Sequence, residues 1–330
     1  MACGYHATMP VMAAATDSDT PVLVDLDTAL GLFFPAGLSP AARARAAEIA
    51  GSTAVDLAGL RRVLGHLNRL AEPSPASIRF SQQDLVATPV SGLLLLVDGA
   101  DGSVSHLIRQ DHVYEPHLAA VFAHYCQPGT TFVDIGANIG YYSVLGARLA
   151  GGGGRVIAIE PNTENCRLLL LSAAINYVST IEVLPVGLDR RRGWSCFSTT
   201  LGTNGRLTEA SLADSTSFIV PTFTLDELVT DPVDLIKIDV EGAEHRVFSG
   251  ARRVLTESRP VVISEFSPRM LSEVSGCTAE DHLRQFTDLG YRLYQIDRTT
   301  YQPIEIHDVT DYLLRWDDPD QIEDLLMVAG

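Results

Sequence analysis

Acidic side chains follow several strand-like runs of this sequence, and a glycine-containing loop follows the first of them. Residues 131–140 read TFVDIGANIG, so Asp134 lies at the end of an apolar run and Gly136, Asn138 and Gly140 follow it. The two glycines permit a tight turn from a strand into a helix and a close approach of the backbone to a ligand. The N–H groups at the start of the helix are free to bind such a ligand.

The spacing of this loop distinguishes two classes of nucleotide-like cofactor. The dinucleotide fingerprint G-x-G-x-x-G has its second glycine where this chain has Asn138, and a side chain there obstructs a pyrophosphate. Asp134 would repel a pyrophosphate, whereas it attracts a sulfonium ligand that also carries an ammonium group. The loop therefore favours S-adenosylmethionine over a nicotinamide dinucleotide.

Glu160 ends the second strand-like run, RVIAIE, and Pro161 and Asn162 begin the next helix. A carboxylate at this point can accept hydrogen bonds from both hydroxyls of a ribose. The helix dipole would favour an acid there even without a ligand. Together with Asp134 and the loop, the ribose-binding interpretation is the stronger one.

The run LIKIDVEGAE contains the candidate catalytic groups. Lys237, Asp239 and Glu241 share one face of an extended strand, because side chains alternate with a period of two. A buried Lys237–carboxylate pair is the structural interpretation. In the functional interpretation, Asp239 lies beside the donor or the acceptor hydroxyl, and Glu241 is a candidate base or orienting acid. Glu265, at the end of ISEF, faces the same crevice.

Two further hypotheses concern histidines and metal ions. His245 is an additional candidate base, and His112 and His117 could line the mouth of a substrate site, although lone histidines more often serve packing. Asp239, Glu241 and Glu265 form an alternative ligand set for a hard cation such as Mg²⁺. We expect no metal, with this set as the alternative.

From residue 130 onward, strand and helix patterns alternate. This rhythm predicts a Rossmann-like, doubly wound and mostly parallel sheet, whose ligands bind at the carboxyl ends of the strands. The expected strands are 131–135, 155–160, 181–188, 234–240, 260–266 and 291–297, with an excursion of β-structure before residue 234 and a closing element at 321–328. The expected helices are 139–149, 163–175 and 279–289.

The chain before residue 113 has a different pattern. Leucines at helical spacing (Leu57, Leu60, Leu64, Leu67 and Leu70) predict helices between 39 and 72. The runs 77–80, 91–98 and 103–110 predict an antiparallel meander, followed by a helix at 115–126. We therefore expect a flexible N-terminus (1–20), an accessory region (21–112) and a cofactor-binding domain (113–330).

Composition limits the partners and the compartment. The 330 residues are 46% hydrophobic and 20% charged, which is typical of a globular protein. The net charge of −17, with a single lysine, argues against nucleic acid as a partner. The absence of a long apolar run argues against a membrane span, and the first residues do not resemble a secretory signal. Five cysteines without metal-binding spacing fit a reducing cytoplasm.

These segments in combination resemble the FkbM family of S-adenosylmethionine-dependent methyltransferases. The resemblance covers roughly residues 112 to 268 and rests on YEP (114–116), TFVDIGANIGYYS, VIAIEPN, VGLD, TLDEL, LIKIDVEGAE and GARRVLTESRPVVISEF. It implies that the loop after Asp134 holds the methionine portion of the donor, that Glu160 holds the ribose, and that Val186 and Gly187 border the adenine. The complete expected cofactor set is Glu115, Asp134, Gly136, Ala137, Asn138, Gly140, Tyr141, Glu160, Pro161, Asn162, Val186, Gly187 and Asp239.

The resemblance also implies a reaction. We expect methylation of a hydroxyl on a small molecule such as a sugar, a polyketide or another specialised metabolite. Methylation of an amide or amine nitrogen is the alternative, and a nicotinamide-dependent oxidoreductase is the competing class. The region before residue 110 could form a cap or the surface of a homodimer.

Overall fold

The computed structural model describes residues 85–99, 104–112, 114–201, 204–208, 217–316, 318 and 320–330, together with 24–25, 44, 46–48, 50–51 and 54–55. The chain divides into two compact units, Met1–Ser77 and Ile78–Gly330. In the first unit, strand β1 (Val24–Asp25) pairs with β2 (Ala54–Val55) in antiparallel orientation. The leucines that predict helices in this unit lie outside the described residues.

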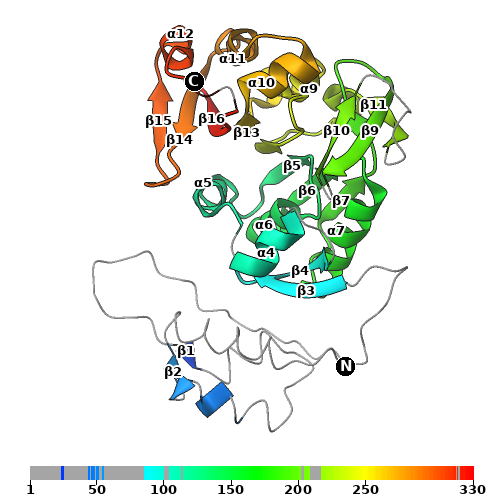
Figure 1. Ribbon diagram of the computed structural model, residues 1–330, viewed down its shortest axis with the longest axis vertical. Coiled ribbons are helices and arrows are strands. Elements are labelled where there is room, and N and C mark those ends of the chain that lie inside the picture. Colours follow the sequence, from blue (N-terminus) through cyan, green and yellow to red (C-terminus); the bar gives the residue numbers. More distant parts are fainter. Residues whose placement is uncertain are drawn as a thin grey trace. The chain divides into compact units, whose positions relative to one another are not determined.

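An eight-stranded sheet organises the second unit (Figure 1), and its order is β15-β14-β16-β13-β12-β5-β6-β7. The five strands from β13 to β7 are parallel, whereas β16 lies antiparallel between β13 and β14. The strands are β5 (Thr131–Ile135), β6 (Arg155–Ile159), β7 (Ile181–Leu184), β12 (Leu235–Ile238), β13 (Val261–Phe266), β14 (Tyr291–Ile296), β15 (Pro303–Ile306) and β16 (Glu323–Ala329). This arrangement confirms the predicted Rossmann-like, doubly wound sheet.

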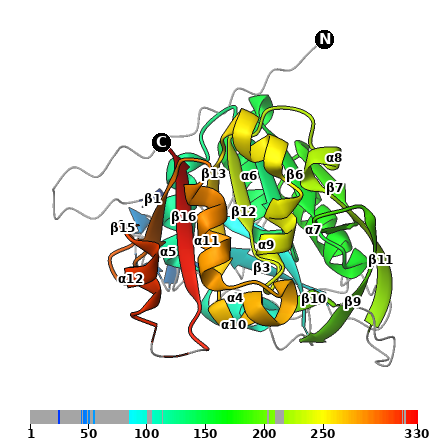
Figure 2. The same cartoon turned by 90° about the horizontal axis from the view of Figure 1, so that it is seen from above.

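Helices cover both faces of this sheet (Figure 2). Successive residues of its strands point to opposite faces and are apolar, so both faces must be buried. Val133 packs on one face with α9 (Glu244–Ser249) and α11 (Ala279–Thr287). Phe132 packs on the other face with α5 (Pro116–Tyr125) and α6 (Tyr141–Ala150). The remaining helical elements are α7 (Thr163–Ile175), α8 (Leu225–Leu228), α10 (Pro268–Met270), α12 (Val309–Leu313), the 3₁₀ turn η1 (Gly151–Gly153) and the π-helical turns η2 (Val254–Ser258) and η3 (Leu271–Ser275).

Within the second unit, a β-hairpin is hydrogen-bonded to helix α7. Strands β3 (Leu85–Val90) and β4 (Leu93–Asp98) form the hairpin. The Leu94 N–H donates to Asn176 Oδ1 at 3.0 Å, and the Leu96 N–H donates to Ser172 Oγ at 2.9 Å. The edge of the hairpin is therefore satisfied by polar side chains at the end of α7.

The predicted strand at 103–110 is wrong. This segment is helix α4 (Val104–Asp111). Val104, Ser105 and Ile108 are buried while Leu107 is exposed, which is the spacing of a helix with one face on the core rather than the alternation of a strand. Of the predicted meander, the run 91–98 contains β4, which pairs with β3, and the run 77–80 lies outside the described residues.

The predicted strand at 181–188 is wrong in extent, because it divides between two sheets. β7 ends at Leu184, and Gly187–Leu188 form β8 in a separate sheet of order β10-β9-β11-β8. Pro185 lies at the break and has no N–H to donate to a ladder. The other strands of this sheet are β9 (Gly193–Leu201), β10 (Asn204–Thr208) and β11 (Ser217–Phe223), which form the predicted excursion.

No helix in the described parts of the chain is both long enough and apolar enough to span a bilayer.

Candidate functional site

A cleft lies at the carboxyl ends of β5, β6 and β12, where the sheet presents the loops that follow these strands. Its empty volume, open solvent included, is about 570 Å³. The predicted residues that line it are Gly136, Asn138, Glu160, Pro161, Val186, Gly187, Asp239 and Glu241. Eight of the sixteen predicted cofactor-binding and catalytic residues therefore meet at this cleft.

The loop after β5 approaches the backbone after β12 too closely for a side chain. Gly136 has φ of +75°, and a Cβ there would lie 1.9 Å from the carbonyl oxygen of Asp239. Asn138 adopts φ of +50°, a left-handed conformation that asparagine tolerates. The loop therefore presents backbone to the cleft, and α6 begins after Gly140, two residues later than predicted.

Glu160 is tied to the loop by backbone hydrogen bonds. The Asn138 N–H donates to Glu160 Oε2 at 2.9 Å, and the Asn162 N–H donates to Oε1 at 2.8 Å. Asn165 Nδ2 also lies 3.5 Å from Oε1. The side chain is 4% exposed, and burial raises the pKa of Glu160 to about 7 despite these donors. Oε2 still has an acceptor position beyond its backbone partner, whereas Asn165 occupies the second position of Oε1.

Asp134 lies beneath the same loop. Its Oδ2 accepts a hydrogen bond from Ser143 Oγ at 2.5 Å, whereas its Oδ1 has no hydrogen-bond partner among the described residues. The residue is 1% exposed, and burial raises its pKa to about 6. A buried carboxylate oxygen without a partner is costly, so Asp134 needs a donor or a cation.

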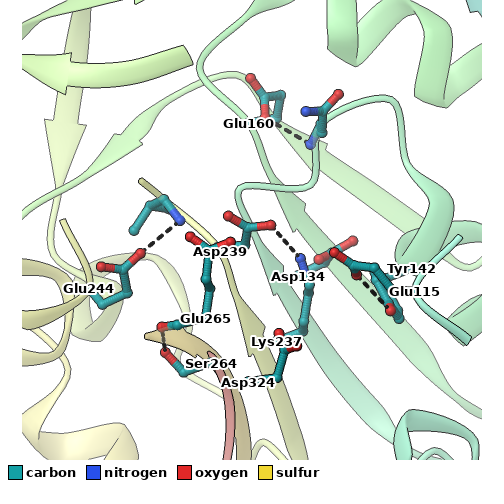
Figure 3. Close-up of polar contacts among 12 residues, drawn as sticks. Glu115, Asp134, Tyr142, Glu160, Lys237, Asp239, Glu244, Ser264, Glu265 and Asp324 are labelled. Atoms are coloured by element: carbon teal, nitrogen blue, oxygen red, sulfur yellow. Dashed lines mark hydrogen bonds and ion pairs between the residues drawn. The ribbon is translucent and has the colours of Figure 1, made fainter. Parts of the chain in front are cut away.

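Lys237 is the buried cation of this region, and Figure 3 shows the carboxylates around it. Its Nζ donates to Asp239 Oδ2 at 3.1 Å and lies 4.9 Å from the centre of the Tyr142 ring. Burial alone would lower the pKa of Lys237, but Asp239, Glu115 and Asp134 raise it above its usual value. The predicted structural pair between Lys237 and a carboxylate is therefore present.

Two other predicted acids lie near this pair without lining the cleft. Glu115 accepts a hydrogen bond from Tyr142 Oη at 2.9 Å, and burial raises the pKa of Glu115. Glu265 lies opposite Asp324 in the β13–β16 ladder. Burial and then Asp239 raise the pKa of Glu265 well above its usual value.

Glu241 and Glu244, although close in sequence, have different surroundings. Glu241 lines the cleft, and burial followed by the charge of Asp239 raises its pKa to about 7. Glu244 accepts the N–H groups of Val240 and Gly242 at 3.1 and 3.2 Å, so it holds the turn that carries Glu241.

Several predicted residues lie outside the cleft, and their contact with a ligand stays a prediction. Ala137 packs in a small apolar cluster with Ala158 and Leu169. A Cβ on Gly140 would lie 2.4 Å from the side chain of Leu169, so this glycine serves helix packing. Tyr141 Oη donates to Ser91 Oγ at 3.1 Å, and the Asn162 side chain caps α7.

The histidines occupy positions away from the cleft lining. The His245 ring lies 6.0 Å from the ring of His282 on α11, and burial lowers the pKa of His245. His117 Nε2 lies 2.8 Å from Asp324 Oδ2, where Arg298 also donates at 3.1 Å. His112 is exposed, with Nδ1 3.1 Å from the carbonyl oxygen of Pro89.

Sequence reasoning missed the wall of the cleft that comes from the separate sheet. Phe197 of β9 and Gly205 and Leu207 of β10 line the cleft, as does Leu188 of β8. The buried residues Phe197, Leu207 and Val220 form an apolar cluster on this sheet. Their alternation along the strands was a signal for β-structure but not for its position over the cleft.

In the part of the chain that the structure describes, no group of three His, Cys, Asp or Glu side chains is placed to hold a metal ion. Asp239, Glu241 and Glu265, the alternative magnesium ligands, therefore do not form such a group. Asp239 instead pairs with Lys237.

Residues 134–293 match the family model described as "Methyltransferase FkbM domain". No curated protein matches the chain. Among solved structures, methyltransferase FkbM from Methylobacillus flagellatus KT has 20% identity and a TM-score of 0.39, over 61% of this chain and 44% of its own. Fibrillarin from Aeropyrum pernix, with natively bound S-adenosyl-L-methionine, has 13% identity and a TM-score of 0.36, over 64% and 73%. Trm5b from Pyrococcus abyssi has 14% identity and a TM-score of 0.41, over 77% and 58%.

This chain thus spans less than half of the FkbM structure from Methylobacillus flagellatus. Similarities of this size add no argument, so the assignment rests on the family model. The sheet order, with antiparallel β16, is the predicted Rossmann-like fold. The match to a methyltransferase domain agrees with the predicted cofactor, S-adenosyl-L-methionine. The family model thus confirms, over residues 134–293, the predicted resemblance to the FkbM family of methyltransferases.

Proposed function

We propose that this chain transfers a methyl group from S-adenosyl-L-methionine to a hydroxyl oxygen of a small molecule. One observation carries the proposal: the carboxylates of Asp239, Glu115 and Asp134 surround a single buried lysine. This surplus of negative charge has little access to water, so a ligand with a sulfonium and an ammonium group would compensate it. A pyrophosphate would add to the repulsion.

The cleft fits the parts of this donor. The backbone of the Gly136–Asn138 loop suits the methionine portion, and the unpartnered Asp134 Oδ1 lies buried beneath this loop, outside the lining of the cleft. Glu160 Oε2 has a free acceptor position for a ribose hydroxyl. Val186, Gly187 and the apolar side chains of the separate sheet suit the adenine.

Glu241 is the residue that we assign to proton removal. When bound, the donor supplies an activated methyl group, and the protein must align an acceptor oxygen with it and remove a proton. A pKa of about 7 lets Glu241 accept a proton near neutral pH. Lys237 Nζ donates to Asp239 Oδ2 at 3.1 Å and thereby fixes the carboxylate of Asp239, two residues before Glu241.

The remaining parts of the proposal concern the acceptor and the compartment. A net charge of −17 disfavours nucleic acid, so we propose a small-molecule acceptor, methylated on oxygen, in the cytoplasm. Methylation on nitrogen is the alternative that product analysis would reveal. We propose that no divalent cation is required, and activity that persists in a chelator would support this.

Calorimetric titrations of the full chain with S-adenosylhomocysteine and with reduced nicotinamide dinucleotide test the cofactor site. We expect binding of the first ligand alone. Binding of the nicotinamide compound without the homocysteine compound would refute the proposal.

A panel of hydroxylated compounds and amines, incubated with a donor that carries a deuterated methyl group, tests the reaction by mass spectrometry. With an accepted compound, Glu241→Gln should lower kcat about 100-fold or more and leave the affinity for S-adenosylhomocysteine unchanged. Glu257→Gln, an exposed residue on η2, is the matched control. An unchanged kcat in the Glu241 variant would remove this residue from the mechanism.

A further inference from the structure

A second pocket lies next to the donor cleft, between β10, α9 and the end of η3. Its lining includes three arginines and one glutamate, namely Arg190, Arg206, Arg246 and Glu273. Its empty volume, open solvent included, is about 900 Å³. Leu207 lines both this pocket and the donor cleft. Figures 1 and 2 both show the β9–β10 hairpin beside α9 and α10.

The pocket is basic in a chain that is strongly acidic. The chain has 41 acidic and 24 basic residues, yet three arginines and one glutamate line this pocket. Glu273 is paired with Arg269 at 3.2 Å, and Arg246 is paired with Asp189 through its Nε at 3.1 Å. Among the described residues, no carboxylate lies within ion-pair distance of Arg190 or Arg206.

These arginines are positioned by the fold. Arg206 lies on β10, which pairs with β9, and Arg190 follows Asp189 directly. The pair of Asp189 with Arg246 fastens the segment after β8 to α9. Ser275 Oγ donates to the carbonyl oxygen of Gly242 at 2.6 Å, which fixes the opposite wall. Guanidinium groups held at one pocket repel each other unless an anion lies between them.

We propose that this arginine pocket binds a carboxylate or phosphate group of the acceptor, and that the acceptor is therefore an anionic molecule. The planar guanidinium fork suits both groups through paired hydrogen bonds. This inference rests on the proposed methyl transfer, because it places the anionic end of the acceptor beside the donor cleft. Burial and Asp239 raise the pKa of Glu241, and the charge of Arg206 partly opposes this rise, so the two sites are electrostatically connected.

The test uses the full chain and two probes, inorganic phosphate and acetate, titrated in chloride-free buffer and followed by the side-chain NMR signals of arginine. We expect the wild type to bind at least one probe, and the tighter one identifies the group. The double variant Arg190→Gln/Arg206→Gln should bind that probe at least tenfold more weakly. Both residues are exposed, so the variant should fold. Arg292→Gln on β14, also exposed, removes one charge elsewhere and should leave the affinity unchanged.

Titration with S-adenosylhomocysteine separates this inference from the proposed function. The double variant should bind it within twofold of the wild type. Binding of neither probe by the wild type, or equal binding by the double variant, would overturn the inference while donor binding stands. A joint loss of probe and S-adenosylhomocysteine affinity would assign the arginines to the donor and would also overturn it. Failure of the wild type to bind S-adenosylhomocysteine would instead contradict the proposed function.

Discussion

Replacing Glu160 with glutamine tests the donor cleft directly, because the carboxylate has both structural and proposed ligand contacts. Its two oxygens accept N–H groups from Asn138 and Asn162 at 2.9 and 2.8 Å. An ionised carboxylate has about four acceptor positions, and Asn165 Nδ2 occupies a third at 3.5 Å from Oε1, so about one remains for a ribose hydroxyl. Glutamine converts one oxygen into an NH₂ group, which opposes a backbone donor and cannot accept from a hydroxyl.

The expected loss follows from one hydrogen bond to a charged group. Such a bond contributes about 1.5–3 kcal/mol. The Kd for S-adenosylhomocysteine should therefore rise roughly 10- to 150-fold at pH 8.

The pH dependence gives a second signature of the same contact. Burial raises the pKa of Glu160 to about 7 in the free protein, and the ribose hydroxyls need the ionised form. Below that pKa a proton must leave before the ligand binds, so affinity falls as the pH falls. From pH 8 to pH 6 the ionised fraction drops from about nine tenths to about one tenth, which predicts a roughly tenfold weaker affinity in the wild type. The glutamine variant should retain only the part due to Asp134, whose pKa burial raises to about 6.

Calorimetry with S-adenosylhomocysteine at pH 8 and pH 6 is the assay, with melting temperatures as the check on folding. Glu164→Gln is the matched control, because Glu164 is an exposed acid on α7 that pairs with Arg167. A folded Glu160→Gln variant with a Kd within twofold of the wild type at pH 8 would refute the ribose assignment.

Three further substitutions test the loop, the buried cation and the core. Lys237→Met leaves buried carboxylates uncompensated and should lower the free energy of unfolding by about 3–5 kcal/mol in chemical denaturation; a loss below about 1 kcal/mol would contradict the network. Gly136→Ala forces a Cβ to within 1.9 Å of the Asp239 carbonyl oxygen at φ of +75°, so S-adenosylhomocysteine should bind at least about tenfold more weakly in calorimetry. His282→Phe removes two buried ring nitrogens without partners among the described residues and should raise the free energy of unfolding by about 1–3 kcal/mol in chemical denaturation at pH 7.5. Burial lowers the pKa of His282 to about 3, so between about pH 6.5 and pH 3 the unfolded state binds more protons than the folded state. The stability of the wild type therefore falls as the pH drops. Chemical denaturation at pH 5 should show that the variant avoids about 2 kcal/mol of this loss.

Local chemistry was sufficient to predict several parts of this molecule. The helix Thr163–Ile175 has its predicted bounds, because Asn162 caps its start by accepting the Glu164 N–H. The buried strands β5, β12 and β13 were visible as short apolar runs bounded by acids and glycines. Parallel strands bring their carboxyl ends to one edge of a sheet, so the sequence alone predicts that Gly136, Glu160 and Asp239 lie at one cleft.

Local patterns failed where one residue type suits two environments. The segment 103–110 has apolar residues that fit either a strand or a helix, and packing on the core selected the helix α4. His245 follows Glu244 in sequence, yet the turn of α9 directs it toward His282. Sequence proximity does not state which way a helix faces.

The doubly wound sheet, the glycine loop and the acids at the strand ends follow from local sequence, because each depends on neighbours within a few residues. The grouping of Asp134, Glu115 and Asp239 around Lys237 depends on tertiary packing, as does the closure of the cleft by Phe197 and Leu207. Tertiary packing alone brought Arg190, Arg206 and Arg246 into one pocket. Such contacts join segments far apart in the chain, and their geometry follows from how layers pack rather than from any local preference.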